Sequence, residues 1–246
     1  MKAREFITKT IGILSMGAVA FAFAATVSVP TTVRADASEA AMLARGGILY
    51  DRWYKVTSGD LPMGTHPSYS KEGKKKKSTT WRCKECHGWD YRGKDGEYKE
   101  GSHFTGVKGI TGAAGKDPAE VIKILKDKTH GYTDGMFSEY DFKSLGLYVS
   151  KGQIDVTKYI GDDKSVKGDA KAGQAYYETI CAGCHGMDGK KISDMPPVGS
   201  VVNKNPWESL HKIRFGQPAE AMPSLIALPL EVSVNVLAYT MTMPQE

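Results

Sequence analysis

Two copies of the pattern Cys-x-x-Cys-His contain all four cysteines of this 246-residue chain. The first copy occupies residues 83–87 and reads Cys-Lys-Glu-Cys-His, and the second occupies residues 181–185 and reads Cys-Ala-Gly-Cys-His. Disulfide loops, a redox-active dithiol or a zinc site can also use paired cysteines. The first two of these do not require the histidine, which would follow a given pair by chance in about one case in 20 to 50. Its presence after both pairs argues against coincidence.

The pattern is typical of covalent haem attachment. Two thiols three residues apart, on a turn that leads into a helix, can reach the two vinyl groups of one haem, and the next residue then directs its imidazole at the iron. We therefore predict two haem c groups, one on each motif. The expected thioether residues are Cys83 and Cys86 for the first haem and Cys181 and Cys184 for the second, and the expected axial ligands are His87 and His185.

The first residues have the layout of a secretory signal peptide. Basic residues precede an uncharged apolar or small-residue run at 11–29, and Ala35-Asp36-Ala37 provides an A-x-A cleavage site. We expect residues 1–37 to be removed and the mature chain to be periplasmic. The alternative is an uncleaved segment that anchors the chain in the membrane, facing the periplasm, because about 19 such residues can just span a bilayer.

The two halves of the chain present the same parts in the same order. A Gly-x-x-Tyr pair precedes the cysteines in each half, at Gly47 and Tyr50 and at Gly173 and Tyr176. We expect helices over about 38–56 and 170–177, and we expect the two tyrosines to pack between the first and last helix of their half.

Helix-start signals follow each motif. Asp117-Pro118 and Asn205-Pro206 both place a capping side chain before a proline, with glutamate at the third helical position. Last helices are expected around residues 142–148 and from about residue 230. The sequence thus predicts an all-α protein.

This order of parts resembles the class I cytochrome c family: helix, Cys-x-x-Cys-His, loops, short helix, ligand methionine and C-terminal helix. The resemblance is close over 168–246 and looser over 38–155, and it implies two tandem helical domains, each around one haem. We expect the first domain at 38–158, with a loop insertion at about 57–80, a polar linker at 159–167, and the second domain at 168–246.

Each haem of an electron carrier needs a sixth ligand. In the second half Met222 precedes a proline in the loop between the last two helices and matches the family's ligand position, with Met195 as its main rival. In the first half an ungapped alignment on Asp117-Pro118 brings Asp134 onto Met222, and Met136 lies two residues away. We therefore predict Met136, with His130 as the alternative and the loop histidines His66 and His103 behind it.

The resemblance implies that a proline carbonyl, from Pro196-Pro197, orients His185, whereas no proline takes that place after His87. Trp81, Trp89 and Tyr91 are expected to pack on the edge of the first haem. Arg82 and Arg92 are candidates to pair with haem propionates.

Composition limits the other functions. The chain is 41% hydrophobic, enough for a buried core, and its formal net charge is +5. Lys74–Lys77 is a local basic run, read either as a solvated loop or as a docking patch for an acidic partner. Because no basic stripe occurs elsewhere in an exported chain, we do not expect nucleic-acid binding.

The sequence thus favours a periplasmic dihaem electron carrier, acting between a protein donor and a protein acceptor, and not an enzyme. One alternative is a haem enzyme with an open sixth site on the first haem, acting on a small inorganic sulfur or nitrogen compound or on a peroxide. Another is a cytochrome subunit of a dehydrogenase complex. Membrane contact is expected only if the N-terminal segment is uncleaved.

Overall fold

The computed structural model describes residues 31–246, with side chains from residue 39 onwards. Most of the predicted signal peptide therefore lies outside the described residues. The described chain is helical and contains no strand, only two isolated bridges, Gly93 to Lys108 and Ile160 to Val166. The all-α prediction is confirmed. In this part of the chain no helix is both long and apolar enough to cross a bilayer.

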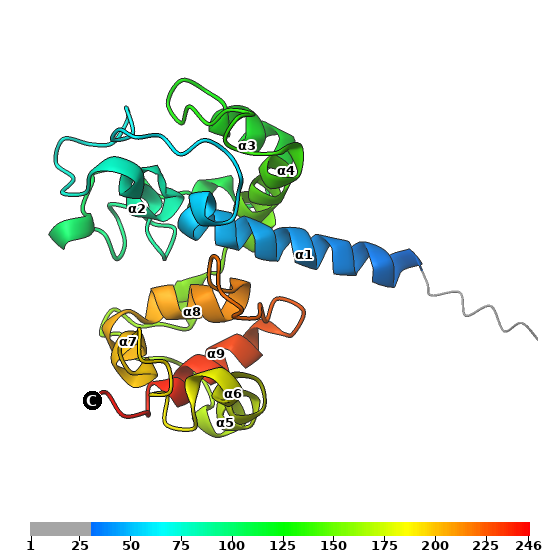
Figure 1. Ribbon diagram of the computed structural model, residues 1–246, viewed down its shortest axis with the longest axis vertical. Coiled ribbons are helices and arrows are strands. Elements are labelled where there is room, and N and C mark those ends of the chain that lie inside the picture. The colour runs from blue at the N-terminus through cyan, green and yellow to red at the C-terminus, as the bar shows by residue number, and fades with distance from the viewer. Residues whose placement is uncertain (1–30) are drawn as a thin grey trace, which may run out of the picture.

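The helices fall into a set before residue 160 and a set after it, seen as the upper and lower groups in Figure 1. The first set is α1 (Thr31–Arg52), α2 (Cys83–His87), α3 (Pro118–Leu125) and α4 (Glu139–Leu147). The second set is α5 (Ala170–Tyr176), α6 (Ala182–His185), α7 (Val198–Lys204), α8 (Pro206–Phe215) and α9 (Leu230–Thr240). Short 3₁₀ turns occur at Trp53–Lys55, Lys77–Trp81, Gly101–His103, Thr111–Ala113 and Val156–Lys158, and π turns at Tyr148–Gly152 and Tyr177–Cys181.

The predicted helix starts are confirmed. The Asp117 carboxylate accepts a hydrogen bond from the Ala119 amide at 2.8 Å, and the Asn205 side chain accepts one from the Glu208 amide at 3.1 Å. Each cap satisfies an amide that has no partner within its own helix. These caps fix where α3 and α8 begin.

In both sets the first helix packs against the last one, α1 against α4 and α5 against α9. Glycines make this close approach possible, because a Cβ on Gly46 would collide with the Ser144 carbonyl of α4 and one on Gly173 would collide with the Asn235 carbonyl of α9. The glycine that corresponds to Gly173 is therefore Gly46, one residue before the Gly47 of the sequence alignment.

The same one-residue shift in the alignment of the two halves changes which tyrosine of the second half corresponds to Tyr50. Tyr50 is buried between α1 and α4 as predicted, with its ring centre 5.4 Å from that of Tyr148. The prediction for Tyr176 is wrong: this side chain is 38% exposed, and the buried ring is that of Tyr177, 5.5 Å from Tyr239. In both halves the tyrosine lies four positions after the glycine, which is the spacing that places two residues on one helix face.

Between the sets, α8 packs against α1 as well as against α9. Gly47 faces Phe215 of α8, and its carbonyl accepts a hydrogen bond from Nε2 of His211 at 2.9 Å. His211 is 1% exposed. The two neighbouring glycines of α1 thus serve different contacts, Gly46 within the first set and Gly47 with the second.

The segments expected as insertion and linker have no long helix. Residues 57–76 form an exposed loop, drawn in cyan in Figure 1, in which Met63 is 89% exposed. Residues 159–167 form a tight turn in which the Lys167 amide donates to the Tyr159 carbonyl at 2.8 Å, and Ile160 is buried.

The shifted register predicts unequal effects at two adjacent tyrosines. Tyr177→Ala removes a buried ring and should lower the free energy of unfolding by about 3 kcal/mol. Tyr176→Ala removes an exposed one and should change it by at most about 0.5 kcal/mol. Urea unfolding of the two haem-loaded variants checks this. A larger loss from Tyr176→Ala would contradict the assignment.

Candidate haem-binding sites

The first motif forms the single-turn helix α2 and is held from three directions. The Tyr50 hydroxyl donates to the Gly88 carbonyl at 2.6 Å, directly after His87. The Trp81 carbonyl, just before the motif, accepts hydrogen bonds from the Trp53 indole at 2.9 Å and from the Tyr132 hydroxyl at 2.8 Å. The cysteines and the histidine are therefore anchored at both ends of the turn.

The second motif is built in the same way from α6. The Tyr177 hydroxyl donates to the Gly186 carbonyl at 2.8 Å, directly after His185. Cys181 is partly buried and Cys184 is exposed. Tyr50 and Tyr177 thus make the same bond to the same place in the two motifs.

The state of the thiols bears on the rival readings of the motifs. All four cysteines are unpaired in the structure. Burial raises the pKa of Cys83 to about 11 and, together with the neighbouring Cys83 and Glu85, that of Cys86 to about 12. Burial likewise raises the pKa of Cys181 to about 11. A reactive dithiol requires a lowered thiol pKa, and burial shifts the pKa of these three thiols in the opposite direction.

A zinc site is not assembled either. Among residues 31–246 there is no group of three or more His, Cys, Asp or Glu side chains placed to hold a metal ion. Each motif nevertheless keeps two unpaired thiols and a histidine on one turn, which is the donor set for covalent haem. The residues therefore fit this cofactor.

The structure identifies the hydrogen-bond partner of His87, which the sequence does not. Its Nδ1 donates to the Lys108 carbonyl at 2.9 Å, which leaves the Nε2 lone pair for a metal. Burial lowers its pKa to about 4, so the ring is neutral, as a ligand must be.

His185 differs from this pattern. Burial lowers its pKa as well. Its Nδ1 is buried without a hydrogen-bond partner among the described residues, so the expected proline carbonyl does not accept this proton.

The predicted methionine ligands lie at the margin of the core. Met222 and Met136 are partly buried and pack against the buried hydrophobic cluster, and Met195 does the same. Met187 is 60% exposed. These placements do not separate the candidates, so the ligand roles of Met222 and Met136 stay predictions.

The alternative ligands of the first half have distinct surroundings. His103 is bound to Glu85, with Nδ1 2.9 Å from the carboxylate. His66 packs on Trp81, with ring centres 4.3 Å apart. His130 lies opposite His87, with ring centres 6.3 Å apart and planes 29° from parallel.

Trp81, Trp89 and Tyr91 are buried, as a role beside the haem requires, but each has protein partners. The Trp89 ring centre lies 4.9 Å from that of His211, and the Tyr91 hydroxyl accepts a hydrogen bond from Tyr148 at 2.9 Å. Packing on the haem edge stays a prediction for these side chains. The sequence missed His211, because nothing in its local pattern shows that α8 contacts α1.

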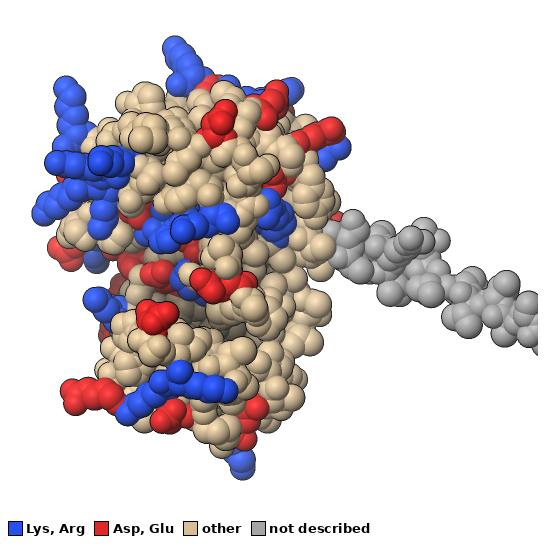
Figure 2. Space-filling view, in the orientation of Figure 1, with Lys and Arg blue, Asp and Glu red and all other residues tan. Residues whose placement is uncertain are grey.

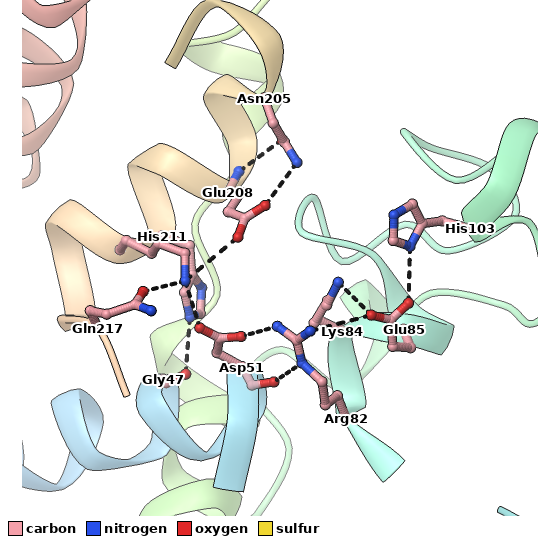
Figure 3. Close-up of polar contacts among 11 residues, drawn as sticks. Gly47, Asp51, Arg82, Lys84, Glu85, His103, Asn205, Glu208, His211 and Gln217 are labelled. Atoms are coloured by element: carbon pink, nitrogen blue, oxygen red, sulfur yellow. Dashed lines mark hydrogen bonds and ion pairs between the residues drawn. The ribbon is translucent and has the colours of Figure 1, made fainter. Parts of the chain in front are cut away.

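Buried charges connect the first motif to α1 and α8, as Figure 3 shows. Arg82 is bonded to the Asp51 carboxylate and donates to the Asp51 carbonyl at 2.7 Å, and Lys212 of α8 donates to the same carboxylate at 2.8 Å. Arg82, which the sequence suggests as a partner of a haem propionate, thus pairs with Asp51. Within the motif, Lys84 lies 2.6 Å from Glu85, which also contacts His103.

These charges shift the pKa of the two carboxylates. Burial raises the pKa of Asp51, but Lys212 and Arg82 together outweigh it and lower the pKa to about 2. Burial also raises the pKa of Glu85, but the hydrogen bond from His103 and the charge of Lys84 outweigh this effect and lower the pKa to about 2. Both carboxylates are ionised at neutral pH, as the buried cations beside them require.

The model for the Cytochrome c family matches residues 170–223, which extend from the start of α5 to the residue after Met222. The matched range includes the second motif, and the match supports a c-type cytochrome with covalently bound haem c, that is, a haem-based electron-transfer protein. The comparisons with curated proteins and with solved structures give no match.

Asp51 should make stability depend on pH. Its folded pKa is below its ordinary value of 3.8, so its stabilising effect is complete above about pH 4 and disappears as the pH falls towards 2. Asp51→Asn should therefore lower the free energy of unfolding by about 2 kcal/mol at neutral pH and by almost nothing near pH 2.

Urea unfolding at several pH values measures this difference. Asp162→Asn, at an exposed position in the turn between the helix sets, is the matched control and should follow the parent protein at every pH. A loss from Asp51→Asn that is equally large near pH 2 would contradict the ionic role of this carboxylate.

Proposed function

We propose that this protein is an exported dihaem cytochrome c that transfers electrons between two protein partners. When bound, haem iron takes up and releases single electrons by cycling between its ferric and ferrous states. The chain binds, orients and shields the two groups. The observation that carries the proposal is the repeated motif architecture: an unpaired thiol pair and a neutral histidine, tied through the next glycine to a buried tyrosine.

The repeat also supports a first haem domain. The family match covers the second motif, whereas the first rests on correspondence: Gly46 with Gly173, Tyr50 with Tyr177, and Tyr148 with Tyr239. We take residues 38–158 as the first domain and residues 168–246 as the second. The linker is the tight turn at 159–167.

Export is part of the proposal. It rests on the basic start, the apolar run and the A-x-A site, and the periplasm is the compartment that these features favour. A segment that stays uncleaved would place the same domains at the outer face of the membrane.

The mass of the intact protein, purified from cells able to attach haem c, tests both the export and the presence of two haems. We expect a chain that begins at Ser38 or within a few residues of it and carries the mass of two haems. Replacing Cys83 and Cys86 by alanine should remove one haem, and so should replacing Cys181 and Cys184. A parent protein with one haem, unaffected by the first pair of substitutions, would refute the dihaem assignment.

The partner surface that we propose is the loop with Lys74–Lys77. Lys74, Lys76 and Lys77 are exposed, and among the described residues none of these four lysines is in an ion pair. Figure 2 shows Lys and Arg side chains gathered at the edge of the upper half, where Figure 1 has the cyan loop. Such a patch suits an acidic electron-transfer partner.

Charge reversal tests this surface. Changing Lys74, Lys76 and Lys77 to glutamate should slow electron exchange with an acidic redox protein about tenfold or more at low salt and remove most of the salt dependence. Lys171→Glu with Lys190→Glu, in the second half, is the control. Equal slowing by both sets of substitutions would show that overall charge, and not this loop, governs the encounter.

A further inference from the structure

The loop that follows α3 brings a second histidine to the first haem motif. His130 faces His87 with a ring-centre distance of 6.3 Å and nearly parallel planes. An imidazole nitrogen lies about 2 Å from a metal that it binds and about 1 Å from its own ring centre. Two imidazoles on opposite sides of one metal therefore have ring centres about 6 Å apart. The observed separation fits one metal ion between the rings.

The hydrogen bonds leave the correct nitrogens available. His87 uses Nδ1 to donate to the Lys108 carbonyl at 2.9 Å, and His130 places Nδ1 3.3 Å from the Asp127 carboxylate. No hydrogen bond involves Nε2 of either ring within residues 39–246. Histidines that bind metals typically hold a carbonyl or carboxylate with their other nitrogen, and both rings show this arrangement.

The loop of residues 57–80 fixes the position of His130. Nε2 of His66 donates to the His130 carbonyl at 2.8 Å, and the Ser68 hydroxyl donates to the Thr129 carbonyl at 2.6 Å. His66 in turn packs on Trp81, beside the first motif. Residues 57–80, which have no counterpart in the second half, thus connect the histidine loop to α2.

Tyr132, two positions after His130, shows that this loop lies close to Cys83, one of the two predicted thioether residues of the first haem. The Tyr132 hydroxyl lies 4.0 Å from Sγ of Cys83 and donates to the Trp81 carbonyl. Met136, four residues further on, has its carbonyl against Gly59 and its side chain against the hydrophobic core. His130 and Tyr132 are thus the residues of this loop that lie against His87 and Cys83 of α2.

We propose that His130, in place of Met136, is the sixth ligand of the haem on Cys83 and Cys86, and that the 57–80 loop holds it there. The inference rests on the proposed dihaem function. It gives the two haems different ligands, two histidines for the first and histidine with methionine for the second. Because a methionine ligand raises the reduction potential relative to histidine, the first haem, when bound, would have the lower potential of the two, which would favour electron transfer from the first haem to the second.

Spectroscopy of the full dihaem protein tests the ligand. In the ferric parent protein we expect two low-spin signals in electron paramagnetic resonance and the weak long-wavelength methionine band at the intensity of one haem. Met136→Leu should leave both unchanged. His130→Ala should convert one haem to high spin, which added imidazole reverses, and His130→Met should double the methionine band.

Contrary results separate the two proposals. Haem content is measured in the same samples, and one haem per chain would overturn the dihaem function itself. Two haems with a methionine band that Met136→Leu halves would overturn only the role of His130. If His130 variants do not mature, the parent spectrum still decides, because a methionine band of two-haem intensity is incompatible with histidine at the first haem.

Discussion

One hydrogen bond, repeated in both halves, connects each Cys-x-x-Cys-His turn to a buried tyrosine. The hydroxyls of Tyr50 and Tyr177 donate to the carbonyls of Gly88 and Gly186, each directly after a motif histidine. Both tyrosines are buried, so these bonds are shielded from water and expensive to break. Each tyrosine also packs against a second tyrosine, which is Tyr148 in the π turn directly after α4 or Tyr239 in α9. The pairing of first and last helix therefore sets where each histidine lies.

The contact between the halves adds a second constraint. α8 of the second half provides Lys212 to the Asp51 carboxylate and His211 to the Gly47 carbonyl, and Asp51 also binds Arg82, the residue before the first motif. A buried ion pair adds little stability by itself, but removing one member is costly because the other charge is left unpaired. The network thus favours one arrangement of α8 beside the first motif. A fixed arrangement suits electron transfer between two haems, because it keeps their separation constant.

Local signals in the sequence were sufficient for much of this structure. The caps at Asp117 and Asn205, the prolines after them and the apolar spacing gave correct helix starts, because these signals act within one turn of a helix. The tyrosine register was missed by one residue, since Gly46 and Gly47 are adjacent and the sequence does not show which of them faces α4. Lys108 acts through its backbone carbonyl, and His211 acts at the interface between the halves. Neither contact can be predicted from the local sequence pattern.

The central claim is that one chain carries two haems with different axial ligands and therefore unequal potentials, a methionine on one haem only. A potentiometric titration of the intact protein, followed by its visible spectrum, tests this claim most directly. We predict two one-electron steps of equal amplitude, with the methionine band lost on reduction of the higher-potential haem only. A single step with the amplitude of one haem, or two steps that both remove a methionine band, would contradict it.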